Sequence, residues 1–552
     1  MSLDVAAAPE ATKTSQDIQD IQDIQENEDD RELLKLGYRA VLARGWGSYD
    51  NFACSFSALY PIGGIRLLFY IAISGGGPAA MWSSWVSGSI LSIITAACLA
   101  EACSSYPAAG SIYYWAFRSW GGGRVGRFVS FLVAAWTLVA WTAFLASDCF
   151  GVANYLVSEV VVFNPDTSFP YDTSDVRARA IAWIFSLFFL GVATSLNFLP
   201  SHMYSWVFRT GVIVIAFDML LNFIWLPIGV SQTYGFQSAE YVFTSTYNGG
   251  DVTPSLNWVL SWFMTASCLV GEDASGHVAE ETVSAKKAAA KGVFWATVAS
   301  ALCGFPIIIL FLFCMPSIET FYNTSAPQPF TNMYALALGP HAHVVMTIIS
   351  MVGGILNTSI SLVAASRLVF AVARDGIFPY SHVLARVSKS KQPHNAVIFI
   401  STIAALLLCT QLPSQVAFSS LISTSAAGSI AAYGLVGIGR AFITRKTFRP
   451  GFWDMGRFGV VAAVVTFVWN GFAFAVLCAP EYSNSQIDKD SSLFNYAIVI
   501  MGGVTILALA EWWRKSKDEW FQHLEPVDTA SETDTSIRRE TQEATWAESK
   551  EV

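Results

Sequence analysis

The chain has 552 residues, of which 53% are hydrophobic, 14% are aromatic and only 13% carry a charge. A soluble domain has roughly a quarter of its residues as Asp, Glu, Lys or Arg. This composition therefore excludes a soluble globular protein and predicts an integral, multi-pass membrane protein. The nine cysteines lie in or beside apolar runs without paired spacing, so neither a disulfide framework nor a metal site is predicted, and no cofactor is expected.

About half of the Asp and Glu residues lie in two polar tails, which account for the net charge of −9. Residues 1–36 include the repeat "DIQDIQDIQ", and residues 516–552 are rich in Ser, Thr and Glu. Both tails lack apolar periodicity and are predicted to be disordered. No charged-then-apolar leader precedes the first apolar run, so the N-terminus is expected to stay cytoplasmic. The membrane domain is expected to cover 37–515.

Apolar runs long enough to cross about 30 Å of hydrocarbon recur along this domain. Twelve are predicted, near 48–74, 79–102, 127–157, 178–199, 205–229, 256–282, 290–315, 342–372, 394–411, 415–439, 457–479 and 493–513. Lys and Arg gather in alternate connections, whereas the opposite connections contain only Lys489. The positive-inside rule then places both termini in the cytoplasm.

The first and sixth runs carry the marks of interrupted helices. Pro61, Gly63 and Gly64 stand in the middle of the first, and Gly271 and Gly276 stand in the sixth. Proline removes a backbone donor and glycine favours non-helical backbone. Broken helices at matching positions of two halves are typical of inverted-repeat transporters. Alternatively, the glycines only permit close helix packing.

The predicted fold is therefore all-α, with two inverted five-helix repeats. The repeats would cover about 48–229 and 256–439, and two additional helices would follow within about 457–513. The second half of the first span is expected to start near Ile65.

Charged residues within the predicted spans point to a binding site. Each costs on the order of 2.5–3.5 kcal/mol at mid-membrane, so they must face a cavity or one another. The residues concerned are Arg66, Asp218, Glu272, Asp273 and, near a span end, Arg209.

The two interruptions would give the site opposite poles. Arg66 and the start of the second half-helix suit a carboxylate. The carbonyls near 268–271, with Glu272 and Asp273, suit an ammonium group. An amino acid has both complements. If Arg66 instead neutralises Glu272 or Asp273, the site keeps a net negative charge and suits an organic cation.

Four segments together resemble the amino acid/choline transporter branch of the amino acid–polyamine–organocation superfamily. They are "GGGPAAMWSSWVSG" (75–88), "AEACSSYPAAGSIYYWA" (100–116), "GEDASGHVAEE" (271–281) and "SRLVFAVARDGIFP" (366–379). The resemblance covers about 37–515. It implies two inverted five-helix repeats plus two helices, and substrates such as amino acids, 4-aminobutyrate, choline, polyamines or vitamins. In fungal relatives the driving force is usually a proton gradient.

By position, the resemblance implies a set of substrate-binding residues. These are Pro61, Ile62, Gly63, Gly64, Ile65, Arg66, Trp136, Thr137, Cys268, Gly271, Glu272, Asp273 and Asn357. Two of them depart from the usual pattern of the family. Glu272 stands where an aromatic residue is more usual, and Arg66 stands where many members have a small or hydroxylated residue.

Two further sets of residues are candidates for coupling and gating. Glu272, Asp273 and His277 could take up a coupled proton, since His277 follows Asp273 by one helical turn; alternatively the histidine is only hydrogen-bonded. Near cytoplasmic helix ends, an inner gate of ion pairs is predicted, with ordinary interfacial anchoring as the alternative. Its candidates are Glu101, Glu280, Glu281, Arg367 and Arg374.

The predicted function is secondary active transport of an amino acid or related small amine, such as 4-aminobutyrate, by alternating access with proton coupling. The alternatives are an organic-cation permease for choline, polyamine or thiamine, and a nutrient sensor that does not transport. No Gly-x-Ser-x-Gly, His-Glu-x-x-His or Walker motif is present, so an enzyme is not expected. The expected partners are a small molecule, protons and the lipid bilayer, without nucleic acid, and the plasma membrane is favoured over an internal one.

Overall fold

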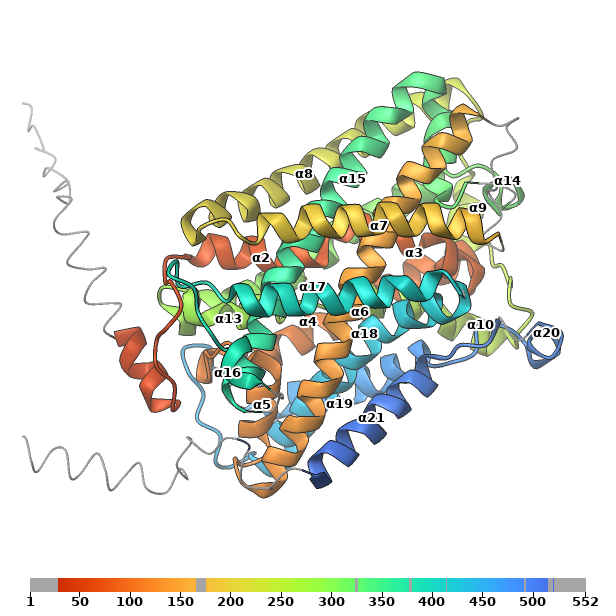
Figure 1. The fold of residues 1–552 in the computed structure, drawn as a ribbon. Coiled ribbons are helices and arrows are strands. Elements are labelled where there is room, and N and C mark those ends of the chain that lie inside the picture. The colour runs from red at the N-terminus through yellow and green to blue at the C-terminus, as the bar shows by residue number, and fades with distance from the viewer. Residues whose placement is uncertain are drawn as a thin grey trace, which may run out of the picture.

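The computed structural model describes residues 28–164, 175–322, 326–376, 380–413, 415–490, 493–514 and 520. Within these ranges the chain forms helices and loops with two isolated β-bridges (Figure 1). The principal helices are α2 (Ser48–Leu59), α3 (Pro61–Ser74), α4 (Gly77–Ser105), α5 (Ser111–Ser119), α6 (Arg124–Phe163), α7 (Val176–Leu196), α8 (Ser201–Gln232), α13 (Ala285–Cys314), α15 (Pro329–Arg374), α17 (His394–Leu408), α18 (Gln415–Ile438), α19 (Phe458–Leu477) and α21 (Ala497–Arg514).

Shorter helices connect these elements or belong to the interrupted sixth span. They are α9 (Ala239–Thr244), α10 (Pro254–Leu260), α11 (Trp262–Cys268), α12 (Ala274–His277), η1 (Ala279–Glu281), α14 (Ile318–Tyr322), α16 (Ser381–Leu384), η2 (Cys409–Gln411), η3 (Gly439–Ile443, a π-helix) and α20 (Asn484–Ile487). The predicted all-α membrane fold is confirmed.

Eleven helical segments of the described chain are long and apolar enough to cross a membrane, with α2 and α3 counted as one. The sixth predicted span is divided into α10, α11, α12 and η1, each too short to cross alone. The count of twelve depends on taking these pieces as one span and stays a prediction.

The first interruption lies at Tyr60, between α2 and α3. Tyr60 has φ 37° and ψ 64°, a left-handed conformation that breaks the helical path. Pro61 is the first residue of α3, where its missing N–H leaves no intrahelical bond unmade. The predicted interruption is confirmed, but its position is corrected: α3 begins at Pro61 rather than near Ile65.

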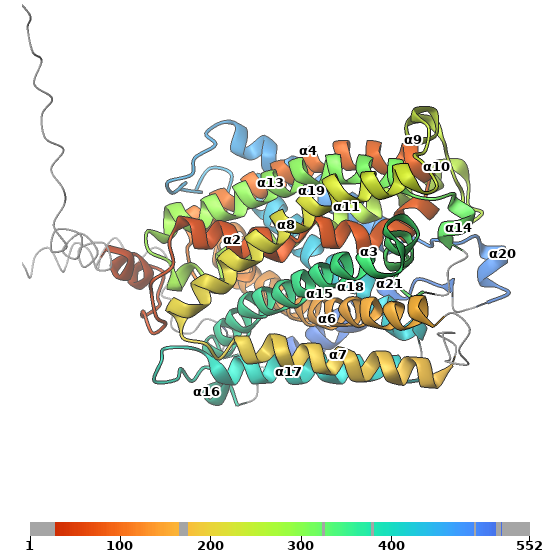
Figure 2. The same ribbon diagram turned by 90° about the horizontal axis from the view of Figure 1, so that it is seen from above.

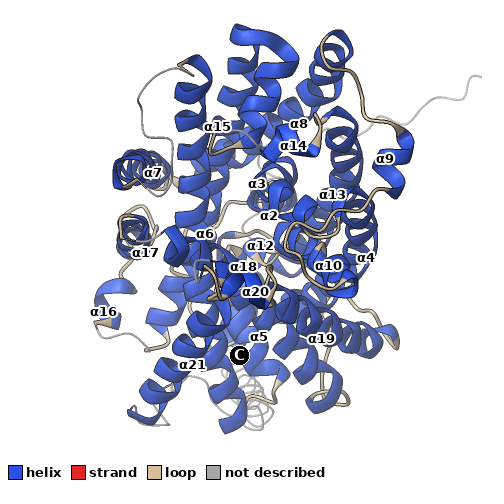
Figure 3. Ribbon diagram, turned by 90° about the vertical axis from the view of Figure 1, so that its right-hand side faces the viewer, coloured by secondary structure: helices blue, strands red, loops and turns tan. Residues whose placement is uncertain are grey.

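The second interruption lies at residues 269–273, between α11 and α12. The short helix α12 is seen near the centre of the view in Figure 3. Gly271 has φ 108°, a conformation open to glycine at no steric cost, so the predicted break at this glycine is confirmed. An unwound backbone in a membrane must be enclosed by protein or border a cavity. Residues 269–277 are accordingly all buried.

Helices at corresponding positions of the two predicted repeats pack on each other. Helix α4 packs along α13, and α6 packs along α15. Seen from above, α7 and α17 lie side by side at one edge of the bundle (Figure 2). The interrupted spans are therefore enclosed by the other helices.

The two ends of the bundle differ in charge. We call the end that carries residues 106–123, 282–284, 375–376, 380–393 and 444–457 the basic end, and the opposite end, beside α14, the α14 end. Residues 28–35 are helical and dock at the basic end, with Leu33 3% exposed. The packed chain therefore begins before residue 37. The rest of the predicted tails, apart from Trp520, lies outside the described residues.

At the α14 end, the loop after α19 packs on the loop before α10. Ser483 donates its backbone N–H to the Gly250 carbonyl at 2.9 Å, and the Glu481 carbonyl lies directly against Gly250. Burial raises the pKa of the Glu481 carboxyl from 4.5 to about 7. The folded protein therefore favours the uncharged form of this side chain.

Glu481→Gln is expected to change how stability depends on pH. Folding raises the pKa of Glu481 from 4.5 to about 7. Below about pH 4.5 the carboxyl is neutral in both the folded and the unfolded protein, so it does not lower the free energy of unfolding. As pH rises to about 7 and above, the carboxyl ionises more readily in the unfolded protein, and the free energy of unfolding falls. The variant should match the wild type at acid pH and be more stable near pH 8, by about 1–3 kcal/mol. Thermal unfolding at both pH values measures this. Glu319→Gln, at an exposed site of the same end, should show no such gain.

Candidate functional site

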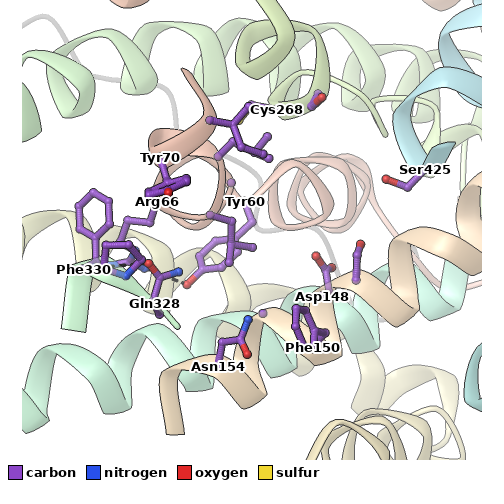
Figure 4. A pocket seen from close by; sticks show the side chains of 18 of the residues that line it. Tyr60, Arg66, Tyr70, Asp148, Phe150, Asn154, Cys268, Gln328, Phe330 and Ser425 are labelled. Carbon is purple, nitrogen blue, oxygen red and sulfur yellow. Dashed lines mark hydrogen bonds between the residues drawn. The ribbon is translucent and has the colours of Figure 1, made fainter. Parts of the chain in front are cut away.

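A cavity of about 740 Å³ lies beside the interruption of the first span. This volume falls within the range of about 300–1,000 Å³ that is common for small-molecule sites. Its walls come from α3, the second half of α6, α11, α15, α18 and the chain before α15 (Figure 4). The lining extends from Asn357, near the middle of the bundle, to Tyr70 and Tyr322 near the α14 end.

Arg66 lines this cavity but its charge is balanced within the wall. Its two terminal nitrogens both donate to the Asp218 carboxylate, with Nη1 2.9 Å from Oδ1, and both side chains are fully buried. The hydroxyls of Tyr60 and Tyr334 accept further bonds from Arg66 at 3.2 and 3.3 Å. Arg66 thus pairs with Asp218 of α8 and with neither Glu272 nor Asp273.

Asp148 of α6 also lines the cavity, and the sequence analysis missed it. Its Oδ2 atom is buried and has no hydrogen-bond partner among the described residues. Asp148 and Ser425 of α18 face the same space from neighbouring helices (Figure 4). The signal was present in the sequence, because Asp148 is an acid inside a long apolar run.

Four of the predicted substrate-binding residues line the cavity: Gly64, Arg66, Cys268 and Asn357. Asn357 also donates its side-chain N–H groups to the Ser57 and Ala58 carbonyls, at 2.7 and 3.0 Å, and so satisfies backbone acceptors at the end of α2.

The other predicted residues do not line the cavity. These are Pro61, Ile62, Gly63, Ile65, Trp136, Thr137, Gly271, Glu272 and Asp273. Trp136 donates its indole N–H to Thr505 of α21 at 2.9 Å. Thr137 bonds the Val133 carbonyl of its own helix at 2.8 Å.

The three proton-coupling candidates have different surroundings. Asp273 accepts from the Tyr433 hydroxyl at 2.6 Å, and its other oxygen lies 3.2 Å from Nε2 of His277. The Nδ1 atom of His277 lies 3.1 Å from the Ala109 carbonyl. Glu272 takes no part in this chain of bonds, and its Oε2 atom has no partner among the described residues.

The gate candidates form buried ion pairs toward the basic end. Glu281 binds Arg367 at 2.6 Å, and Glu280 binds Arg374 at 2.9 Å. Gln392 bonds both members of the first pair. Glu101 binds Arg440 at 3.1 Å and is only 1% exposed. These pairs join η1, α15 and the helices around them at the basic end of the bundle.

Glu281→Gln is expected to loosen this end. Removing one member of a buried ion pair leaves the other charge uncompensated. Cys54 is a buried residue of α2 beside this pair and should then react faster with a small thiol reagent. The rate should rise about tenfold for each 1.4 kcal/mol by which the variant shifts the equilibrium from the closed to the open form of the basic end. Labelling kinetics in membranes measure this rate, with Cys54→Ser as the background control. If Cys54 reacts at the same rate in the variant and the wild type, the Glu281–Arg367 pair anchors the helices and does not act as a gate.

A bundle with two interrupted helices, a central cavity and a closed set of ion pairs at one end is the architecture of a solute permease. The family model described as "Amino acid permease" matches residues 50–504, and the chain belongs to this family. It is an integral membrane permease for a small molecule, not an enzyme.

Curated relatives match over most of their length. The "Thiamine transporter thi9" of Schizosaccharomyces pombe is 43% identical over 93% of this chain and 90% of its own. The "Amino-acid permease BAT1" of Arabidopsis thaliana is 27% identical over 89% and 95%. The "GABA-specific permease" of Saccharomyces cerevisiae is 26% identical over 87% and 83%.

Proposed function

We propose that this permease carries an organic cation of the thiamine class by alternating access. The observation that carries the proposal is the charge of the cavity. Among its described lining residues, Arg66 and Asp148 are the only members of the Asp, Glu, Lys, Arg and His group. Since Asp218 balances Arg66, Asp148 is the one described lining group whose charge would be left uncompensated, and a bound cationic substrate would pair with its carboxylate.

Aromatic rings in the lining support the same class of substrate. Tyr60, Phe144, Phe150, Phe263 and Phe330 all border the cavity. Ring faces attract cations, including those without N–H donors, such as a thiazolium. The 43% identity to a relative named as a thiamine transporter agrees with this chemistry.

An amino acid or 4-aminobutyrate fits the cavity less well. Its carboxylate needs an uncompensated positive group, and the guanidinium of Arg66 already makes two bonds to Asp218. Because more distant relatives are named as an amino-acid permease and a GABA-specific permease, amino acids are the alternative substrate class to be tested.

The orientation in the membrane is part of the proposal. Lys and Arg gather at the basic end, so the positive-inside rule places that end and both termini in the cytoplasm. With the ion pairs closed there, the described conformation would receive its substrate from the α14 end. We place the protein in the plasma membrane, with uptake coupled to protons.

Uptake by purified protein in proteoliposomes tests this function. Labelled thiamine is expected to enter saturably, and unlabelled thiamine should compete better than choline, spermidine, 4-aminobutyrate or a neutral amino acid. Competition led by 4-aminobutyrate would favour the amino-acid class. Binding of thiamine without saturable uptake would favour a sensor.

A further inference from the structure

A second, much smaller cavity lies behind the unwound segment of the sixth span. Its volume is about 10 Å³, room for on the order of one water molecule. Glu272 lines it together with Ser92 and Thr95 of α4, Tyr433 of α18 and Asn470 of α19. Glu272 is 1% exposed, so it has no contact with bulk solvent.

Three of the polar side chains around Glu272 direct their donors elsewhere. The Tyr433 hydroxyl donates to Asp273 at 2.6 Å. The Trp469 indole N–H donates to Ser92 at 3.2 Å. The side-chain amide of Asn470 donates to Thr95 at 3.1 Å and to the Thr466 carbonyl at 2.8 Å.

No cation is placed to balance a carboxylate at Glu272. Among the described residues that line this small cavity, Tyr433 is the only other titratable one. Of the neighbouring charged groups, Asp273 has the same sign as an ionised Glu272, and the histidine beside it, His277, bonds to Asp273. A buried, unpaired charge is so costly that the group neutralises instead. For a carboxylate, that means binding a proton.

The geometry points to Glu272 as a proton-binding site that is separate from the substrate cavity. The cavity around it is too small for an organic ion, whereas Asp148 faces a space large enough for one. The ligand of Glu272 is therefore a proton, held on a carboxyl oxygen in the described conformation.

The two sites share one wall. Val270, two residues before Glu272, lines both the large and the small cavity. The backbone between them is the unwound segment, and the Glu272 carbonyl is held by the Ser55 hydroxyl of α2 at 2.9 Å. On the function proposed above, substrate and proton would be bound together, and movement of this segment as the basic end opens would hydrate Glu272 and let it release the proton on that side.

Infrared spectroscopy of the purified protein in lipid tests the proton site without any substrate. The wild type at neutral pH is expected to show a protonated-carboxyl band that shifts in heavy water, and Glu272→Gln should lose that component. Glu272→Met, which also lacks a carboxyl, provides a second variant in case one fails to fold. Glu240→Gln, at an exposed residue of α9, should leave the band unchanged. A band that is identical in the wild type and both Glu272 variants would overturn the inference.

Transport in the same proteoliposomes tests the coupling. Glu272→Gln is expected to lose accumulation of thiamine driven by an imposed pH gradient, while exchange of labelled for unlabelled thiamine persists. Equal gradient-driven accumulation by the variant and the wild type would contradict a role in coupling. Failure of the wild type to transport thiamine would contradict the proposed substrate alone, because the infrared result does not depend on it.

Discussion

Asp148→Asn is expected to abolish effective thiamine uptake. The substitution keeps the shape of the side chain but removes the one uncompensated charge among the described lining residues of the large cavity. Loss of one partner from a buried, hydrogen-bonded charge pair costs about 2–5 kcal/mol, so affinity should fall at least about 30-fold. Binding to the protein in nanodiscs and uptake in proteoliposomes measure the effect separately.

Two controls accompany this variant. Asp148→Glu keeps the charge and should restore part of the affinity. Asp251→Asn, at an exposed loop residue with φ 50° that asparagine tolerates, should leave uptake unchanged. If Asp148→Asn binds thiamine with wild-type affinity, the cation does not pair with this carboxylate.

Asp218→Asn is expected to have the largest effect on stability. It would leave the Arg66 guanidinium fully buried without its counter-charge, which costs about 3–5 kcal/mol. The variant should unfold at a clearly lower temperature in nanodiscs of fixed lipid composition. The double variant Arg66→Met with Asp218→Leu should recover much of the loss, because it removes both charges together.

The pair between Arg209 and Asp50 provides the matched control. It joins α8 to α2 at 3.2 Å, but the Arg209 side chain is 42% exposed. Arg209→Gln should therefore change stability by about 1 kcal/mol at most. Equal losses from Asp218→Asn and Arg209→Gln would show that burial of the Arg66 pair does not govern its contribution.

The sequence predicted the class of fold because the strongest signals are local. Apolar length identified the spans, and Gly271 marked the second interruption. The first interruption was misplaced by about one turn because Pro61 can begin a helix as readily as it can break one. The residue at which the helix is interrupted is Tyr60. A tyrosine in the sequence does not predict a left-handed backbone conformation.

The partners of charged side chains were harder to predict. Arg66 and Asp218 are separated by 152 residues, so only the packing of α3 on α8 brings them together. Trp136 belongs to α6, whose second half lines the large cavity, yet its indole N–H bonds to Thr505 of α21, and Glu272 lines the small cavity instead. The direction of a side chain depends on helix rotation, which short motifs do not encode.

The ring of Tyr60 restricts how related permeases can diverge. A Cβ atom at Gly63 would overlap its ring carbons, and a Cβ atom at Gly353 of α15 would overlap its hydroxyl. Alanine at either glycine is therefore acceptable only after residue 60 has become smaller. A permease that keeps the tyrosine ring in this position should therefore keep both glycines.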